Sequence, residues 1–253
     1  MGLTLLQSAT GYHYEESSMA AEGIPLESAK WNALSKENVS LLDEWNSGLI
    51  EKQLLSYMFR VNYDYNNKYL LTVSGRWDGA SQLAEGNKWA FFPSAALGWR
   101  LDQEEFLKDV TWLNQLKFRL GVGVTGNSAI DPYQTKGAIV SLYYPFGSAL
   151  APGYAASEPL IKDGAVAMAN KNLSWEKTTQ YNIGLDYSVL NGRISGVLDF
   201  YTSRTTDLLM AMTIPSLNGY TNTYANVGKT SNIGVDITLN TVNVKTRDFE
   251  WST

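Results

Sequence analysis

Few residues in this sequence could perform covalent chemistry. The 253 residues contain no cysteine and a single histidine, His13. These counts exclude a thiolate nucleophile, a Cys-ligated zinc and a multi-histidine metal site. Glu15 and Glu16 do not suit a glycosidase, because adjacent side chains on a strand point to opposite faces. We therefore predict no catalytic residue, no metal site, no cofactor and no enzymatic activity.

Composition narrows the class of protein further. The net charge of −5 argues against nucleic acid as a partner, because neutralising phosphates requires clustered Lys and Arg. No run of about 18 apolar residues is present, so no transmembrane helix is predicted. The first residues, MGLTLL, lack the basic head and long apolar run of a secretion signal. With 12% aromatic and only 18% charged residues, the chain is not of the disordered type.

The clearest pattern is strict alternation. From residue 55 to 65 the odd positions are apolar or aromatic and the even positions mostly polar, and the same pattern resumes at residues 69–77 after the turn 66–68. Because strand side chains alternate between faces, this predicts a β-hairpin with one apolar face. Further alternating segments are residues 3–14, 89–100, 116–127, 179–189, 194–203 and 232–241, and another strand begins near residue 249.

Strand and loop lengths favour a membrane barrel. Strands of about 10–12 residues can cross a bilayer at a tilt. Connections tend to alternate between short (66–68, 190–193, 242–248) and long (79–88, 128–177, 208–223), with residues 101–115 as an exception. Amphipathic spacing predicts short helices at residues 102–114 and around 39–45. The predicted fold is an all-β, antiparallel transmembrane barrel wall.

A different class of protein fits the same alternation. In a soluble or surface-anchored β-sandwich that binds carbohydrate, the apolar face would be the core between two sheets. The two alternatives differ in where Tyr57, Phe59, Val61 and Tyr63 lie, which is against lipid in the barrel and buried in the sandwich.

An ordered series of motifs carries a family resemblance. The motifs are NYDYNNKYLLT (62–72), RWDGAS (76–81), Trp89, FPS (92–94), GWR (98–100), LKFR (116–119), GVTGN (123–127), Ile130, Tyr133, NLSWEKTTQYNIGLD (172–186), DFY (199–201), TDLL (206–209), NVG (226–228) and NIGVD (232–236). In this order they resemble the SusC/RagA branch of TonB-dependent outer-membrane transporters from Bacteroidetes.

The resemblance implies a fold, a location and partners. Residues 1–253 would be a C-terminal-half fragment, about eight to nine strands of a plugged barrel of about 22 strands, with the signal peptide, plug domain and final strands absent. Short turns would face the periplasm and long loops the exterior of the outer membrane. The parent protein would import oligosaccharides or peptides, powered by the TonB complex and covered by a SusD-like surface lipoprotein.

Two sets of residues are candidates for contact with a plug or a solute. Polar side chains on the face opposite the apolar one would line the lumen, and the alternative is that they are ordinary solvated residues. These are Arg60, Arg76, Asp78, Arg119, Asp186 and Asp199. Aromatic side chains in or beside the long loops would stack on sugars, and the alternative is that they pack the loops together or touch the lid. These are Tyr133, Tyr143, Tyr144, Tyr154, Trp175, Tyr220 and Tyr224.

Overall fold

The computed structural model describes residues 1–22, 41–136, 140–146, 149–155, 168–215, 217, 220 and 222–253. The chain divides into two units. The main sheet comprises Met1–Ala9 and Leu54–Thr253, and the extended hairpin comprises Thr10–Gln53. Among the described residues, every helix is too short or too polar to cross a membrane.

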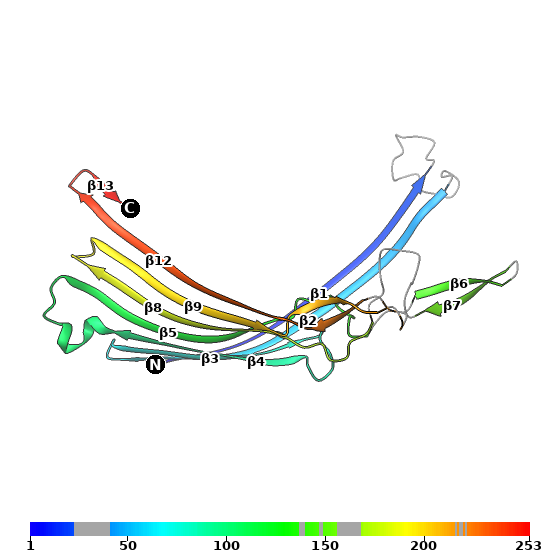
Figure 1. Ribbon diagram of the computed structural model, residues 1–253, viewed down its shortest axis with the longest axis horizontal. Coiled ribbons are helices and arrows are strands. Elements are labelled where there is room, and N and C mark those ends of the chain that lie inside the picture. Colours follow the sequence, from blue (N-terminus) through cyan, green and yellow to red (C-terminus); the bar gives the residue numbers. More distant parts are fainter. Residues whose placement is uncertain are drawn as a thin grey trace. The chain divides into compact units, whose positions relative to one another are not determined.

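Nine strands form one sheet in the order β1-β2-β3-β4-β5-β8-β9-β12-β13, and the pairs from β2 onward are antiparallel (Figure 1). Their bounds are β1 Gly2–Glu22, β2 Leu41–Tyr65, β3 Tyr69–Ala80, β4 Trp89–Arg100, β5 Leu113–Asn127, β8 Glu176–Val189, β9 Ile194–Thr206, β12 Lys229–Lys245 and β13 Glu250–Ser252. Two small hairpins lie in the long connections: β6 Val140–Phe146 with β7 Ala149–Ala155, and β10 Leu209–Thr213 with β11 Asn222–Asn226. The predicted all-β class is confirmed, and the predicted strands lie within strands of this sheet. β1 and β2 extend beyond the predicted ranges 3–14 and 55–65, and the two small hairpins lie in segments predicted as loops.

The helix predicted around residues 39–45 is wrong. Residues 41–45 belong to β2, which is 25 residues long, and Val39 lies outside the described residues. The neighbouring strand β1 is itself 21 residues long, so ladder pairing can continue well past the segment with clear alternation. Tertiary pairing therefore overrides the local helical spacing.

The helix predicted at residues 102–114 is also wrong. In its place the chain makes two 3₁₀ turns, Leu101–Gln103 and Glu105–Leu107, with Glu104 extended between them (φ −81°, ψ 147°). Side-chain bonds to the backbone and to neighbouring strands compete with a helix here. The Asp102 carboxylate accepts from the Leu116 backbone N–H at 3.3 Å and from Arg100 Nη2 at 2.8 Å.

Register divides the main sheet into two chemically different faces. One row of register partners across the strands is polar or glycine, and the next row is apolar or aromatic except at Thr202. The polar row is Arg60, Ser74, Ser94, Gly123, Gln180, Ser203 and Asn232; the next row is Val61, Val73, Ala95, Val122, Tyr181, Thr202 and Ile233. Moving one residue along every strand thus exchanges one face for the other.

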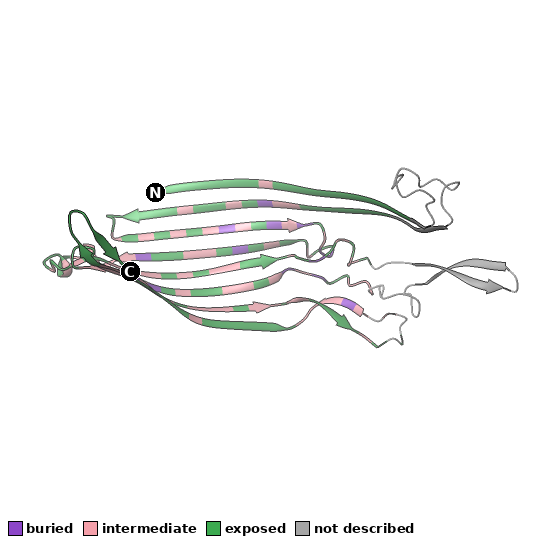
Figure 2. Ribbon diagram, turned by 90° about the horizontal axis from the view of Figure 1, so that it is seen from above, coloured by how far each residue is buried: buried purple, intermediate pink, exposed green. Residues whose placement is uncertain are grey.

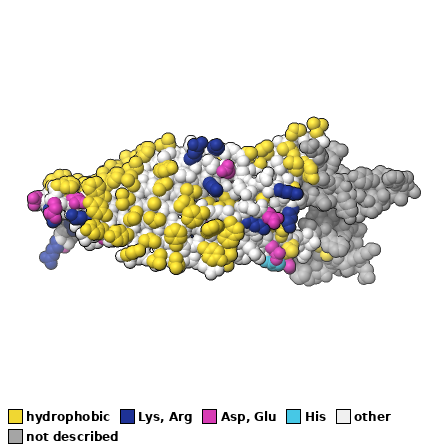
Figure 3. Space-filling model, turned by 90° about the horizontal axis from the view of Figure 1, so that it is seen from below, with side chains coloured by type: hydrophobic (Ala, Val, Ile, Leu, Met, Phe, Trp, Pro, Cys, Tyr) yellow, Lys and Arg dark blue, Asp and Glu magenta, His cyan; other side chains and the backbone are white. Residues whose placement is uncertain are grey.

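The apolar face is uncovered. The main sheet is curved (Figure 1), and Figure 3 views its convex side, where hydrophobic side chains cover much of the middle. Figure 2 shows few buried residues along the strands, as expected for a single layer. Tyr57, Phe59 and Tyr63 remain 47%, 40% and 45% exposed. In the described part of the chain no second sheet buries these side chains, which argues against the sandwich alternative.

The described part of the extended hairpin, taken by itself, carries a small group of polar contacts between its strands. His13 lies between two carboxylates, with Nδ1 3.0 Å from Glu51 Oε1 and Nε2 3.2 Å from Glu15 Oε1. The Lys52 ammonium lies 4.8 Å from the centre of the Tyr12 ring. These contacts join the two strands of the hairpin on a surface exposed to solvent.

A single-layer sheet depends on small residues where side chains cross the backbone. At Gly196 an added Cβ would lie 2.4 Å from the Thr238 backbone oxygen and 2.5 Å from the Tyr187 hydroxyl, whereas at Gly121 the nearest atom is 3.9 Å away.

We expect Gly196→Ala to lower the free energy of unfolding by about 1–3 kcal/mol, because β9 and β12 must separate. Gly121→Ala is the matched control. Urea unfolding followed by tryptophan fluorescence measures both, and equal effects would contradict the steric argument.

Candidate functional site

Aromatic side chains gather at both ends of the apolar face. Near the turns, the Tyr69 ring stacks on Tyr65 and Trp99, with ring centres 6.4 and 6.3 Å apart. Near the long loops, Tyr57 stacks on Trp89 at 6.3 Å and Trp77 meets Phe91 edge-on at 6.2 Å. Tyr69 and Trp77 lie on the same strand, β3, and at about 3.3 Å per residue they are roughly 26 Å apart. This matches the apolar band of about 25 Å found in outer-membrane barrels.

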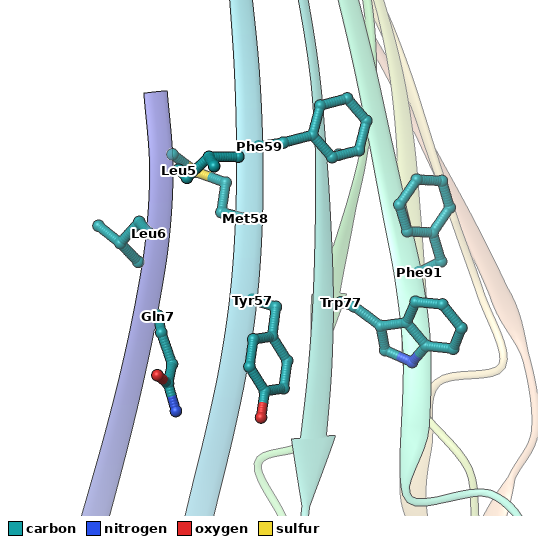
Figure 4. A pocket seen from close by; sticks show the side chains of 9 residues that line it. Leu5, Leu6, Gln7, Tyr57, Met58, Phe59, Trp77 and Phe91 are labelled. Carbon is teal, nitrogen blue, oxygen red and sulfur yellow. The ribbon is translucent and has the colours of Figure 1, made fainter. Parts of the chain in front are cut away.

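A shallow hollow of about 450 Å³ lies on this face (Figure 4). It is lined by Leu5, Leu6, Gln7, Tyr57, Met58, Phe59, Gly75, Trp77 and Phe91. Gly75 lets the Phe59 and Phe91 rings approach the backbone, because a Cβ there would lie 2.7 and 2.6 Å from them. The lining carries no charged group, so the hollow suits apolar contact and offers no set of groups for a polar solute.

The opposite face carries a charged cluster centred on Arg119. Its Nε lies 2.9 Å from Asp186 Oδ1, and its Nη2 lies 3.0 Å from both oxygens of Asp199. The guanidinium lies over Gly184, where a Cβ would be 2.7 Å from the Arg119 Cζ. Asp236 of β12 is the register neighbour of Asp199. Three strands are thus joined by one cation and two carboxylates.

A second cluster lies nearer the long loops. Arg76 Nε donates to both oxygens of Asp78 at 2.7 and 2.9 Å, and Nη2 donates to Ser56 Oγ at 2.9 Å. Ser56 is fully buried and Asp78 is 8% exposed, so the Arg76 side chain covers them. Arg60 lies on the same face as an exposed cation, at the register position of Ser74.

All six residues predicted to line a lumen therefore share the polar face; the structure brings five of them together in two groups, and Arg60 belongs to neither group. Whether that face lines a closed lumen stays a prediction. In the described part of the chain, no group of three or more His, Asp or Glu side chains could hold a metal ion.

The long connections pack into a small core at the rim of the sheet. Its members are Ala80, Leu83, Ala84, Phe92, Ile130, Leu173 and Trp175. Trp175 is 5% exposed, meets the Phe92 ring edge-on at 5.3 Å, and donates from Nε1 to the Lys88 backbone oxygen at 2.9 Å. Asn226 reinforces the core by accepting from the Ser174 N–H and donating to the Ser174 oxygen, both at 2.8 Å.

The predicted solute-binding aromatics occupy different environments. Trp175 belongs to the buried core and Tyr224 packs against it, whereas Tyr133 is 48% exposed and Tyr220 is partly exposed. Tyr143 and Tyr144 lie on β6 and Tyr154 on β7, and their side chains lie outside the described part of the chain. For Trp175 the geometry matches the alternative in which it packs the loops together. Contact with a solute stays a prediction for the whole set.

The sequence analysis did not predict the role of Glu104, which lies at the end of the sheet with the short turns, away from the long connections. Glu104 accepts hydrogen bonds from Tyr69 Oη at 2.8 Å, Trp99 Nε1 at 3.0 Å and Lys68 Nζ at 3.2 Å. The donors Trp99, Tyr69 and Lys68 together lower the pKa of the Glu104 carboxyl below its usual value. Glu104 lies in a segment whose spacing resembles the start of a helix, and no pattern in the neighbouring sequence indicates this role.

Comparison with known proteins gives a consistent set of relatives. The family model described as "TonB dependent receptor-like, beta-barrel" matches residues 7–253. TonB-dependent receptor SusC of Bacteroides thetaiotaomicron is 39% identical over 87% of this chain and 22% of its own length. TonB-dependent receptor P26 of Formosa agariphila is 37% identical over 91% of this chain and 22% of its own. The RagAB peptide importer in its open-open state superposes with a TM-score of 0.80 at 27% identity, covering 98% of this chain and 26% of that one.

Arg119 is expected to hold the polar face together. We expect Arg119→Gln to lower the free energy of unfolding by about 1.5–3 kcal/mol, because two part-buried carboxylates lose a charged donor. Lys117→Gln, on the same strand and face, is the control and should change stability by less than about 0.5 kcal/mol. Urea titration in lipid vesicles measures both. Adding Asp199→Asn to Arg119→Gln should recover part of the loss, and failure to recover would contradict the charge argument.

Proposed function

The chain belongs to the TonB-dependent receptor family, in its β-barrel region, and on that premise we propose that it forms part of the wall of an outer-membrane importer. Barrels of this family are outer-membrane proteins, and the apolar band between two aromatic rows supports the same location for this chain. The observation that carries the proposal is the register, which sorts apolar and polar side chains onto opposite faces of one uncovered sheet.

The sheet would be completed by further strands. Its outermost strands, β1 at one side and the short β13 at the other, each have one neighbour among the described residues. Unpaired backbone groups are not tolerated in lipid, so a barrel wall must close. The chain also spans only 22% of the length of SusC and 26% of the RagAB chain it matches. Residues 1–253 are accordingly proposed to be one part of a larger barrel domain.

The polar face would line the lumen of that barrel. On this face Arg76 with Asp78 forms a neutral pair, and Arg119 with Asp186 and Asp199 forms a cluster with one excess negative charge. Paired charges leave a hydrophilic wall without a strong field, which suits the passage of a polar solute past an internal plug domain. Arg60, which is exposed on the same face, is the best placed residue for contact with a plug or a solute.

The cargo would be an oligosaccharide or a peptide. The similarity to the RagAB peptide importer supports a peptide, and an oligosaccharide is the other class of cargo that the resemblance to SusC/RagA transporters implies. Partners would be a SusD-like surface lipoprotein over the long loops and the TonB complex on the periplasmic side. Among the loop aromatics whose side chains the structure describes, Tyr133 is 48% exposed and Tyr220 is partly exposed, so we propose these two for stacking on a cargo.

Purification of the full-length protein from outer membranes tests the function. We expect a surface lipoprotein to co-purify, with bound oligosaccharide or peptide identified by mass spectrometry. Tyr133→Ala and Tyr220→Ala should each reduce the retained cargo by about two- to tenfold, the range for one aromatic contact. Tyr65→Ala, at the opposite end, is the control. Purification without lipoprotein or cargo would count against an importer of this type.

The membrane-facing side has its own test. Val61 lies in the middle of the apolar face, opposite Val73, and Asn62 is its neighbour on the polar face. We expect Val61→Arg to lower folding stability in lipid vesicles by about 2–4 kcal/mol, the cost of a cation near the middle of the bilayer. Asn62→Arg should be tolerated. Unchanged assembly of Val61→Arg would show that the two faces have been assigned the wrong way round.

A further inference from the structure

The polar face of the main sheet carries an aromatic ring near its middle. This face is the concave side of the sheet, opposite the hydrophobic surface of Figure 3. Among the described residues, the register from β2 to β12 places two aromatic side chains on it, Phe92 and Tyr201. Phe92 belongs to the buried core at the rim, whereas Tyr201 lies near the middle of β9 and is partly exposed.

The Tyr201 ring lies across the neighbouring strand. Tyr201 is the register partner of Gly234 on β12 and of Asn182 on β8. A Cβ at Gly234 would lie 2.3 Å from the Tyr201 Oη, 2.4 Å from its Cζ and 2.7 Å from its Cε1. The phenol end of the ring therefore lies over the β12 backbone, in a position that any side chain at residue 234 would exclude. Glycine thus gives this ring a fixed place on the wall of the sheet.

Amide, hydroxyl and carboxylate groups surround this ring. Register partners lie about 5 Å apart, and residues two positions apart on one strand share a face at a separation of about 7 Å. The positions that border Tyr201 on the polar face therefore follow from the pairing of β8, β9 and β12. We define the Tyr201 surface as Tyr201 with Gln180, Asn182, Ser203, Asn232 and Asp236.

The polar groups of this surface have no partner within the sheet. In the part of the chain that the structure describes, the side chains of the Tyr201 surface make no hydrogen bond or ion pair. The polar groups on either side are satisfied. Toward the long loops Thr178 bonds to Thr205 at 2.7 Å, and toward the turns Arg119 bonds to Asp199 at 3.0 Å. The unpartnered amides and the Ser203 hydroxyl lie between these two groups.

Small residues leave the amides accessible along the sheet. On β5, Gly121 and Gly123 are the register partners of Asn182 and Gln180. At Gly121 an added Cβ would have no atom nearer than 3.9 Å. No side chain of β5 therefore stands beside these two amides, so a solute can reach them from that side.

This combination of groups suits a sugar. A pyranose ring can stack its C–H face on an aromatic ring, while each of its hydroxyl groups both donates and accepts a hydrogen bond. Amide side chains offer both a donor and an acceptor, and the Asp236 carboxylate accepts. None of the side chains is cationic, and Arg119, in the next row toward the turns, is already bound by Asp186 and Asp199. A peptide would therefore find no available partner here for its carboxylates.

We propose that the Tyr201 surface is an oligosaccharide subsite on the wall of the sheet, with a pyranose ring stacked on Tyr201 and its hydroxyl groups bonded to the amides and to Asp236. The inference rests on the proposed function, under which this face lines the lumen. It selects the oligosaccharide from the two classes of cargo, and it places one sugar contact inside the lumen in addition to the loop aromatics.

Calorimetric titration of the full-length protein in detergent measures the binding. The probes are neutral glucan, fructan, mannan and xylan oligosaccharides and, separately, a mixture of short peptides. For the oligosaccharide that binds most tightly, we expect Tyr201→Ala to weaken the affinity about two- to tenfold, the range for one aromatic contact. Tyr187→Ala is the matched control, because Tyr187 crosses Gly196 on the opposite, apolar face. It should leave the affinity unchanged.

A second variant leaves the aromatic ring in place. Gly121→Val puts a side chain beside Asn182 at a position where the structure has room for it. Valine suits a strand, so we expect assembly to be normal and the oligosaccharide affinity to fall by a similar factor. This variant answers the question even if Tyr201→Ala does not assemble.

Cysteine labelling tests whether a sugar reaches the surface. Ser203→Cys, in the full-length protein freed of any other cysteine, reports on the Tyr201 surface. Asn240→Cys, on the same face nearer the turns, is the control. We expect saturating oligosaccharide to slow the reaction of position 203 with a water-soluble maleimide and to leave the rate at position 240 unchanged.

The outcomes separate the two proposals. If an oligosaccharide binds but Tyr201→Ala and Gly121→Val bind it as tightly as the wild type, the subsite is overturned and the importer stands. Labelling of position 203 that the sugar does not slow, or no labelling at all because a plug covers it, also overturns the subsite. Binding of peptides but of no oligosaccharide overturns the choice of a sugar. If neither class binds and no lipoprotein co-purifies, the proposed function itself fails.

Discussion

The structure depends on one constraint: a single layer of strands must satisfy its backbone hydrogen bonds within itself while presenting two different faces. In a soluble sandwich the apolar face is hidden by a second sheet, and strand register is fixed by the packing between them. In the described part of the chain the strands of this sheet pair only with their neighbours within it, so register is set by cross-strand pairs such as Val61 with Val73 and Ser74 with Ser94. A slip of one residue would place Arg60 on the apolar face, a costly exchange in lipid.

The same constraint explains where glycines and charges occur. With no second layer, a long side chain can only lie across its own sheet, and it needs a position without a Cβ to do so. Arg119 crosses at Gly184 to reach Asp186 and Asp199, and Tyr201 crosses at Gly234, where a Cβ would meet its hydroxyl at 2.3 Å. The charged cluster therefore joins three strands laterally, a role that a hydrophobic core performs in a layered protein.

Much of this arrangement can be predicted from the alternation in the sequence. A period of two assigns each side chain to one face of the sheet, and a short turn makes two consecutive strands neighbours. The spacing of residues along the sequence is enough to place Arg76, Asp78, Arg119, Asp186 and Asp199 on one face. It cannot reveal that Arg119 bridges both aspartates, since that depends on register across β5, β8 and β9. Glu104 escapes prediction for a related reason. Its partners Lys68, Tyr69 and Trp99 come from strand ends up to 36 residues away, while its local spacing resembles a helix start.

The two ends of the sheet are stabilised by different means. At the rim near the long loops, Trp175 and Phe92 are buried, and backbone–side-chain bonds such as those of Asn226 fix the chain from residue 168 to 176. At the turn end no comparable core exists among the described residues, and a carboxylate with three donors fixes a connection that displays apolar side chains. The end near the long loops is therefore fixed by side-chain packing, whereas the turn end is fixed by hydrogen bonds between its connections.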